Sequence, residues 1–513
     1  MIITYIIGVD IGTQGVKGAL LNQEFEIVAR AYIETYYLQP KPNWVEHDSE
    51  KVWWGGFKTI VKQLLRDIPR EKISGIGCSG VSPCLLPMDK GDRPLRNAIL
   101  YGIDTRSKDE VREMTARLGE DQVLELSRQP LSTQSIGPKL LWYQKNEPHN
   151  FDKTERIFTS SNYIVYKLTG NYVLDHSQAS EYAPFYNYHK KDWDNRTISL
   201  YEMPLKLFPP LKNAYDIGGT ITKEAAEETG LPEGIPVVVS TVDAFAELLS
   251  VGGVDKGEVV LIYGTTGIIA LATDKMPLVK DLYVYPHPLH DNLYVVSGGM
   301  ATTAALTKWF RDNFGELEKL MQGRLGVNAY ELLSEQAAKV PPGSEGLMVL
   351  PYFSGERTPH NDPLARGVLM GLTTYHGRAN IYRALLEGTA YGYKQHFDLF
   401  SEYGFEVQKV VACGGGSKSA LWVQIVSDVT GYDQQLPNAP LGSEIGAAFL
   451  VAKAIGLQDD FSTIRTKLIS RNGVNYVTAN LKNHHVYQDY YAIYTRLYEN
   501  IKDDMHALAQ LVV

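Results

Sequence analysis

Three features are scarce in this chain of 513 residues, and each scarcity excludes a class of protein. The cysteines number only three, Cys78, Cys84 and Cys413, and their scattered positions match neither a disulfide framework nor a zinc site. No apolar run approaches the roughly 20 residues of a membrane span. No basic stretch resembles a nucleic-acid surface, and the formal net charge is -9. We therefore expect a cytoplasmic protein that has neither membrane nor nucleic acid as a partner.

A repeated motif divides the chain into two halves. GVDIGTQGVKGALL occupies residues 8–21, and VVLIYGTTGIIALA occupies residues 259–272. Because 513 residues exceed what a single hydrophobic core usually supports, two large domains are expected. We place them at residues 1–250 and 251–513, so that one copy of the motif lies near the start of each.

Each copy of the motif predicts a β-hairpin with a tight Gly/Thr turn. Gly12-Thr13-Gln14-Gly15 aligns with Gly264-Thr265-Thr266-Gly267, and apolar runs flank both turns. Glycine lets the backbone approach a ligand closely, and successive N–H groups in such a turn can bind an anion. Two facing turns could hold a polyphosphate from both sides. The alternative is that both are ordinary hairpin turns.

Polar side chains follow three predicted strands of the first half. Ser82 comes after ISGIGC (73–78), Asp104 and Arg106 come after a short apolar run (98–101), and Asp243 comes after a β-branched run (236–240). Ligands usually bind at the carboxyl ends of strands in α/β sheets. Asp104 and Arg106 could grip hydroxyl groups, or they could cap the next helix and form a surface ion pair. Asp243 could act on a ligand, cap a helix over residues 244–249, or do both.

A late glycine-rich turn predicts a nucleotide site. The strand KVVAC (409–413) runs into Gly414-Gly415-Gly416-Ser417, and a helix is expected over residues 419–430. The glycines would let a ligand lie against the backbone, and a helix N-terminus favours phosphate. A simple tight turn is the alternative. The loop over residues 352–363 is interpreted as an ordered structural loop at a domain interface.

Four segments together resemble the FGGY family of carbohydrate kinases, which belongs to the actin-like ATPase superfamily. The Walker A motif GxxxxGK[ST] is absent, and so are the signature motifs of protein kinases. The segments that carry the resemblance are DIGTQGVK (10–17), YGTTG (263–267), GERTPHNDPLARGVLMGLT (355–373) and ACGGGSKS (412–419). They are spread over nearly the whole chain in the family's order.

The resemblance implies an α/β fold in which two ribonuclease-H-like domains flank a deep cleft. The first domain would bind mainly sugar and the second mainly ATP. A homodimer is also implied as an option, because dimers are common in the family. The implied activity is ATP-dependent phosphorylation of a sugar hydroxyl, with Asp243 as the general base and Asp10 holding Mg²⁺ through water. The other implied cofactor-binding residues are Thr13 and Gln14 near the γ-phosphate, Lys17 in the same motif, Gly264, Thr265 and Thr266 at the nucleotide phosphates, and Gly414, Gly415, Gly416 and Ser417 at the adenosine.

Within the family the chain is most similar to the xylulokinase-like branch, through its length, WVEHD (44–48) and GERTPHNDP (355–363). It departs from that branch where Val81-Ser82-Pro83 replaces the usual Gln-Met-His and where Ala244 follows the base. These changes remove partners for hydroxyl groups, so a different ketose, a polyol or a sugar acid is a realistic substrate. The expected substrate contacts are Ser82, Asp104, Arg106 and Asp243. The rival hypothesis is an actin-like nucleotide-dependent switch or chaperone without a small-molecule acceptor.

Overall fold

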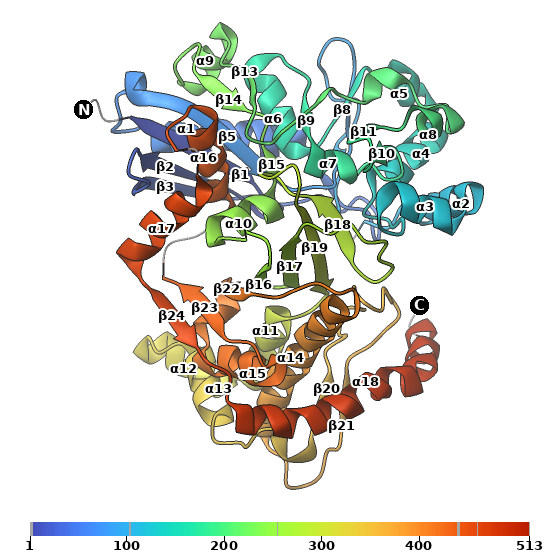
Figure 1. Ribbon diagram of the computed structural model, residues 1–513, viewed down its shortest axis with the longest axis vertical. Coiled ribbons are helices and arrows are strands. Elements are labelled where there is room, and N and C mark those ends of the chain that lie inside the picture. Colours follow the sequence, from blue (N-terminus) through green and yellow to red (C-terminus); the bar gives the residue numbers. More distant parts are fainter. Residues whose placement is uncertain (1–3, 102–103, 254, 439–441, 459, 512–513) are drawn as a thin grey trace.

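Two seven-stranded mixed sheets, one in each half of the chain, define the architecture (Figure 1). The computed structural model describes residues 4–101, 104–253, 255–438, 442–458 and 460–511. The mixed α/β class and the two-sheet division agree with the prediction.

The first sheet has the strand order β13-β14-β5-β1-β2-β3, with β15 also paired to β5. The predicted first hairpin is confirmed, because β1 runs antiparallel to β2. β5 and β15 lie parallel beside β1 in turn, so the carboxyl ends of three strands meet at one edge. The strands are β1 (Tyr5–Ile11), β2 (Gly15–Asn22), β3 (Ile27–Glu34), β5 (Ile73–Gly80), β13 (Ile217–Thr220), β14 (Pro236–Val238) and β15 (Thr241–Val242).

The second sheet has the order β18-β19-β17-β16-β22-β23-β24. Its central hairpin, β16 with β17, confirms the second predicted turn, and β22 matches the predicted strand before the glycines. The strands are β16 (Glu258–Tyr263), β17 (Gly267–Thr273), β18 (Tyr283–Pro286), β19 (Tyr294–Met300), β22 (Lys409–Cys413), β23 (Gln434–Pro437) and β24 (Val474–Val477).

Helices and short strand pairs surround the first sheet. Asp48 caps the first helical segment by accepting a hydrogen bond from the Lys51 N–H, and Trp53 and Trp54 are buried as predicted. The helices of this half are a π-helical segment (Ser49–Trp54), α1 (Gly55–Leu64), α2 (Lys108–Leu118), α3 (Glu120–Ser127), α4 (Ile136–Asn146), α5 (Pro148–Lys153), α6 (Ser160–Thr169), α7 (His176–Ser180), α8 (Asn195–Leu200), α9 (Lys223–Thr229) and α10 (Asp243–Val251). The short strands are β4 (Glu46–His47), β6 (Leu86–Met88), β7 (Ala98–Ile99), β8 (Arg156–Phe158), β9 (Leu174–Asp175), β10 (Tyr186–Asn187), β11 (Asp192–Trp193) and β12 (Leu211–Lys212).

The second half carries its longer helices below its sheet in Figure 1. The buried side of α14 packs on α15 and on the short strand pair β20–β21. The elements are α11 (Ala304–Phe314), α12 (Glu316–Leu325), α13 (Ala329–Ala337), β20 (Met348–Leu350), β21 (Val368–Met370), α14 (Arg378–Glu402), α15 (Ala420–Thr430), α16 (Ser443–Ala454), α17 (Phe461–Asn472) and α18 (Leu481–Gln510). The predicted start of α16 at Leu441 lies outside the described residues.

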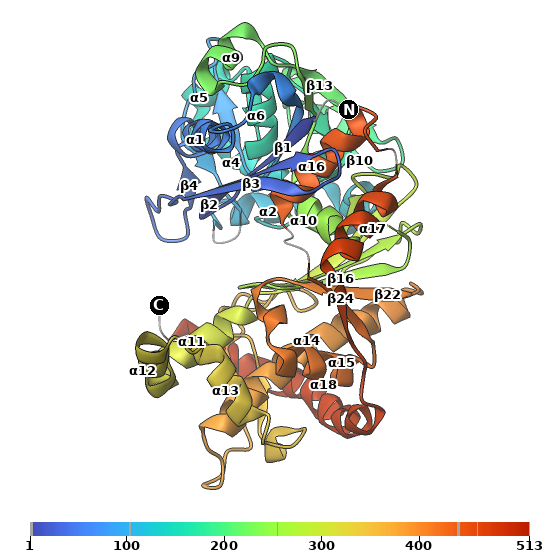
Figure 2. The same ribbon diagram turned by 90° about the vertical axis from the view of Figure 1, so that its left-hand side faces the viewer.

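One helix from the second half packs on the first sheet. α16 lies against β1, β5 and α10, beside the blue strands in both Figure 1 and Figure 2. The approach is close: a Cβ added at Gly8 would lie 1.8 Å from the Glu444 carbonyl oxygen, and one at Gly446 would lie 1.8 Å from that of Ala246. Only glycine permits such backbone contact. The two halves are therefore joined by interlocked elements as well as by the chain itself.

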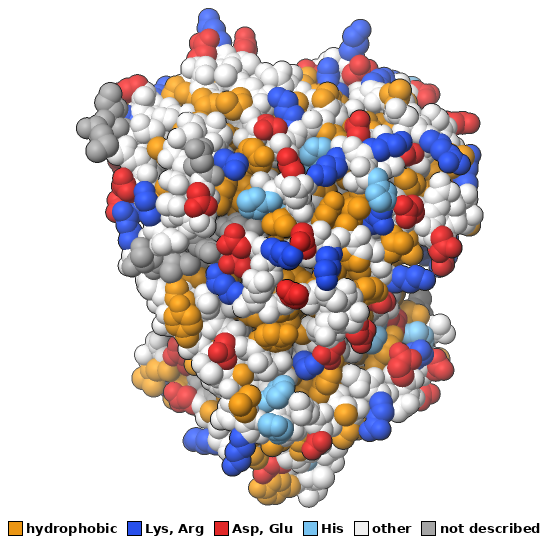
Figure 3. Space-filling view, in the orientation of Figure 1, with side chains coloured by type: hydrophobic (Ala, Val, Ile, Leu, Met, Phe, Trp, Pro, Cys, Tyr) orange, Lys and Arg blue, Asp and Glu red, His pale blue; other side chains and the backbone are white. Residues whose placement is uncertain are grey.

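Acidic and basic side chains are interspersed on the face shown in Figure 3, and neither sign of charge forms a large patch there. Hydrophobic side chains on that face are scattered among them. Among the described residues, no helix is both long enough and apolar enough to cross a membrane.

Candidate active site between the two sheets

The first hairpin ends in a small charged group. Asp10 is 1% exposed, and its Oδ1 accepts a 2.8 Å hydrogen bond from the Ser79 hydroxyl on the neighbouring strand. Lys17 faces Asp10 across the hairpin, with its Nζ 3.6 Å from Asp10 Oδ2. Burial alone would lower the pKa of Lys17, but the carboxylates of Asp10 and its neighbours raise it above its ordinary value. Lys17 therefore remains charged beside Asp10.

Asp243 lies next to this group, directly after β15. It is the first residue of α10 rather than its cap, because Val242 holds the cap position, and its Oδ1 accepts a 2.7 Å hydrogen bond from the Ala244 N–H. Burial, followed by the negative charge of Asp10, raises the pKa of Asp243 to about 8. A carboxyl group with a pKa near neutrality is suited to accepting a proton.

The turn of the first hairpin is held in place by the His47 side chain and by a backbone N–H group. Trp53 Nε1 donates to His47 Nδ1 at 3.0 Å, so the proton of the neutral imidazole is on Nε2, which donates to the Thr13 carbonyl oxygen at 3.1 Å. Burial lowers the pKa of His47 to about 4, which keeps the ring neutral. The Gln14 carbonyl oxygen accepts the Thr35 N–H at 3.0 Å. The turn is thus held by its carbonyl oxygens.

The turn of the second hairpin is held by a helix instead. The Gly264 carbonyl oxygen accepts the Ala304 N–H at 2.9 Å, and the Thr265 carbonyl oxygen accepts the Thr303 N–H at 3.0 Å. These N–H groups lie at the start of α11. Thr266 is exposed at the tip of the turn, and Gly264 and Thr265 lie beside it.

The glycine-rich turn packs against the second hairpin. Gly414 has φ +94°, and a Cβ there would come within 2.9 Å of the Tyr263 backbone. A Cβ at Gly416 would lie 2.5 Å from Trp422, whereas a Cβ at Gly415 would meet nothing within 4 Å. Ser417 donates its hydroxyl to the Gly414 carbonyl oxygen at 2.8 Å. Gly415 and Gly416 belong to a short 3₁₀ turn (Gly415–Lys418) that precedes α15, and Gly415 faces open space.

A second group of polar residues surrounds a small cavity of about 40 Å³ near Asp243. Glu181, which ends α7, is 7% exposed and accepts a short hydrogen bond from the Ser82 hydroxyl. Burial raises the pKa of Glu181 well above its ordinary value, and the charges of Asp175 and Asp243 add to this effect. Other lining residues are Pro83, Gln129, Gln134, Tyr283, Tyr285 and Arg357. We refer to this space as the Glu181 cavity.

Asp104 and Arg106 form a buried ion pair away from this cavity lining. Arg106 Nη2 lies 2.7 Å from Asp104 Oδ2, and Arg106 Nη1 lies 2.9 Å from Glu46. Neither side chain of the pair is exposed, and the guanidinium group lies 4.1 Å from the Trp44 ring centre. The pair is therefore buried rather than a surface ion pair, and it ties the Trp44 loop to the end of β7. Residues 102–103, between this pair and β7, lie outside the described residues.

Sequence reasoning missed three residues that the structure brings to the site. Glu181 and Arg357 both line the Glu181 cavity. Tyr101 lies close enough to Asp243 and Thr13 for both residues to affect the pKa of its hydroxyl group. Within the described part of the chain, the buried Arg357 Nε has no hydrogen-bond partner. The acidic residue inside the polar and aromatic stretch DHSQASEYAPFY (175–186) was the available signal for Glu181. Arg357 lies in the loop that was interpreted as structural.

Family models match both halves of the chain. The model of the N-terminal domain of the FGGY family of carbohydrate kinases matches residues 5–250, and that of the C-terminal domain matches residues 259–455. A xylulose kinase of Escherichia coli (strain K12) is 30% identical over 87% of this chain and 88% of its own. A gluconokinase of Bacillus subtilis (strain 168) is 26% identical over 97% of this chain and 96% of its own.

The crystal structure of a xylulose kinase from Rhodospirillum rubrum matches with a TM-score of 0.88 and 30% identity, covering 98% of this chain and 100% of that one. The two mixed sheets and this structural match show that the chain has the actin-like ATPase fold. The chain belongs to the FGGY family of carbohydrate kinases, whose members phosphorylate an alcohol group. A switch or chaperone without a small-molecule acceptor is not favoured, since the relatives are sugar kinases.

Proposed function

We propose that this kinase transfers the γ-phosphoryl group of ATP to a hydroxyl group of a small sugar, with Asp243 as the general base. The observation that carries this proposal is the position of Asp243 directly after β15, beside Asp10, with a pKa raised to about 8. A carboxylate there can take the proton of a sugar hydroxyl as the oxygen attacks. General-base assistance of this kind contributes roughly 10²–10⁴-fold to the rate.

The residues around Asp243 fit a nucleotide and a magnesium ion. Mg²⁺ usually keeps several waters and takes only one or two carboxylates in addition to phosphates, which suits the single buried carboxylate of Asp10. When bound, the ion would neutralise charge on the phosphates. Thr13, Gln14 and Lys17 would face the γ-phosphate, and Gly264 to Thr266 the other phosphates. The adenosine would lie over Gly414 to Ser417, where the open space at Gly415 supports the assignment.

The Glu181 cavity is the proposed place for one end of the sugar, because its volume of about 40 Å³ is smaller than a whole sugar. Ser82, Glu181 and Gln134 offer hydroxyl, carboxyl and amide groups, which can bind a polyhydroxy compound. Arg357 adds a guanidinium group that would also suit a carboxylate. The two relatives also differ in whether the named sugar carries a carboxylate, since one is named a xylulose kinase and the other a gluconokinase. A ketose such as xylulose, a related polyol or a sugar acid is therefore proposed, and Asp104 and Arg106 remain predicted contacts.

The test is ADP release measured with and without a panel that contains D-xylulose, xylitol and D-gluconate. We expect at least one member of the panel to stimulate release in the natural chain. Asp243→Asn should lose sugar-dependent turnover by about 10²–10⁴-fold, because the amide cannot accept the proton. Nucleotide binding, measured by calorimetry, should remain nearly intact. Asp109→Asn, on the exposed face of α2, serves as the matched control.

Full activity of Asp243→Asn would overturn the role of the base. Failure of the whole panel, together with ADP release that no sugar changes, would overturn the transfer to a sugar hydroxyl.

A further inference from the structure

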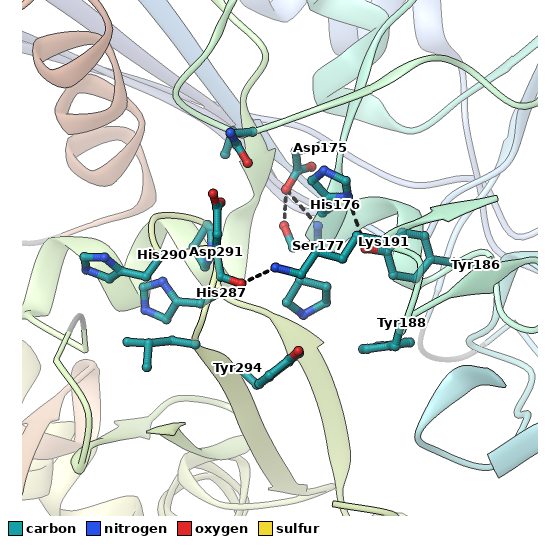
Figure 4. Close-up of a pocket in the computed structure, with 15 residues that line it drawn as sticks. Asp175, His176, Ser177, Tyr186, Tyr188, Lys191, His287, His290, Asp291 and Tyr294 are labelled. Atoms are coloured by element: carbon teal, nitrogen blue, oxygen red, sulfur yellow. Dashed lines mark hydrogen bonds between the residues drawn. The ribbon is translucent and has the colours of Figure 1, made fainter. Parts of the chain in front are cut away.

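A second and larger cavity, of about 220 Å³, lies between the two halves (Figure 4). One wall comes from the first half, at the start of α7 and the β10–β11 hairpin, and includes Asp175, His176 and Tyr186. The other wall is the loop that joins β18 to β19, from His287 to Tyr294. We refer to it as the junction cavity. None of the residues implied for sugar or nucleotide lines it, and its place between domains is typical of ligand sites.

The junction cavity presents polar groups that have no partner. Within the described part of the chain, the Tyr294 hydroxyl, the Asn213 side-chain amide and the His290 ring make no hydrogen bond, and His176 uses only its Nδ1, towards the Tyr186 hydroxyl. Aromatic rings with a few unpaired polar groups form the usual lining of a small-molecule site. These groups would bind hydroxyl groups of a ligand.

The lining carries more negative than positive charge near neutral pH, because Asp175 and Asp291 outnumber Lys191. Burial lowers the pKa of both His176 and His290, so each ring is neutral near neutral pH. At the rim, the Lys191 ammonium group donates to the backbone carbonyl oxygen of Asp291. The Asp175 carboxylate is already occupied by the Ser177 and Gln178 N–H groups and by hydroxyl groups. A cavity with a net negative lining suits a neutral ligand better than an anion.

The floor of the junction cavity is connected to the proposed base. Thr241 Oγ1 lies 2.9 Å from Ser177 Oγ and 3.2 Å from Asp175 Oδ2, and Thr241 precedes Asp243 by two residues. The helix α7 begins at this cavity and ends at Glu181, which lines the other one. A ligand that rests on α7 would therefore act on the position of both residues.

We propose that the junction cavity is a second binding site for a neutral polyhydroxy compound of monosaccharide size, and that its occupancy changes turnover at Asp243. The ligand would touch both halves and so strengthen their contact across Lys191 and Asp291. Binding energy that differs between two arrangements of the halves shifts the equilibrium between them. The effect on turnover rests on the proposed function, whereas binding at the cavity does not.

The test uses hydrogen exchange on the full chain, with xylitol, D-gluconate and inorganic phosphate as separate probes. Xylitol should slow exchange in two segments, residues 286–294 and 186–193, because a bound polyol suppresses local opening. The double variant Asn213→Leu/Tyr294→Phe should lose this protection at least fivefold in apparent affinity. Asn292→Leu, which is exposed and outside the lining, is the matched control and should keep it.

Xylitol should also change the velocity of ADP release driven by the best panel substrate, and the double variant should respond less. Absence of protection in both segments, or equal protection in the double variant, would overturn the site. Protection by phosphate or gluconate but not by xylitol would overturn the neutral class of ligand. Normal sugar-dependent turnover, without slower hydrogen exchange in either segment, would overturn the second site but not the proposed function.

Discussion

The two hairpins have the same turn but different flanking residues. A Cβ at Gly12 would come within 2.9 Å of a carbonyl oxygen of its own turn, and so would a Cβ at Gly264. Two residues before the turn, however, Asp10 in the first hairpin corresponds to Ile262 in the second. Two residues after it, Lys17 corresponds to Ile269. The turn sequence thus determines shape, and the flanking positions determine which hairpin carries charge.

Their supports differ in the same way. The His47 side chain and the Thr35 backbone N–H hold the carbonyl oxygens of the first turn, whereas two backbone N–H groups at the start of α11 hold the second. The first turn therefore depends in part on one side chain, that of His47. The second depends on the position of a helix, which most substitutions in the turn leave unchanged.

The largest expected effect comes from removing the charge of the first hairpin. Asp10→Asn should lower kcat by about 10²–10³-fold, the usual loss when one group that stabilises transition-state charge is removed. The Ser79 hydroxyl can still donate to the remaining carbonyl oxygen, so the fold should persist. Ile262→Val, at the matching position of the second hairpin, should change kcat by less than about threefold, in line with a small core substitution. Steady-state ADP release measures both.

The same variant should shift the pH profile. A base must be ionised, so kcat/KM of the natural enzyme should rise with pH and level off above about 8, the pKa of Asp243. Because the charge of Asp10 contributes to that raised pKa, Asp10→Asn should move the acid limb to lower pH. An unmoved limb would contradict the coupling of the two carboxylates.

An intermediate effect is expected at the glycine turn. Gly415→Val should raise KM for ATP about tenfold, equivalent to roughly 1.4 kcal/mol, with little change in KM for the sugar. The valine would extend into the open space over Gly415, so folding should be unaffected. Gly414→Ala is the contrasting variant, because φ +94° and the Tyr263 backbone leave no room for a side chain. It should lower the melting temperature instead. A larger rise in KM for the sugar than for ATP would count against the adenosine site.

The smallest effect is expected at the brace of the first turn. His47→Ala leaves the Trp53 N–H and the Thr13 carbonyl oxygen without partners, at a cost of about 1–3 kcal/mol in the free energy of unfolding. The displaced turn should also raise KM for ATP several-fold. Trp53→Phe removes only the donor to His47 and leaves the contact with Thr13 in place, so it should raise KM for ATP less than His47→Ala does. Equal KM for ATP in all three proteins would show that the brace serves stability alone.

Local patterns predicted the parts of the site that are continuous in sequence. Both hairpins and the strand before Gly414 followed from apolar runs and glycines, and Asp243 was proposed because it follows a buried strand. The contact between Ser82 and Glu181 joins residues 99 positions apart, and the brace at Thr13 joins residues 34 apart. A single sequence contains no signal for such pairings. For the same reason the burial of the Asp104 and Arg106 pair was not anticipated.

The helix α16 limits how this enzyme can be recombined. It lies more than 400 residues after the first hairpin in the sequence, yet it shares a hydrophobic cluster with Ile6 and Leu21 of that hairpin. A chimera that joins residues 1–250 of this chain to the remainder of a relative would pair β1 with a foreign α16. Where Gly8 and Gly446 allow backbones to touch, even one added methyl group would force the elements apart. Engineers who exchange specificity between family members should therefore transfer α16 together with the first half.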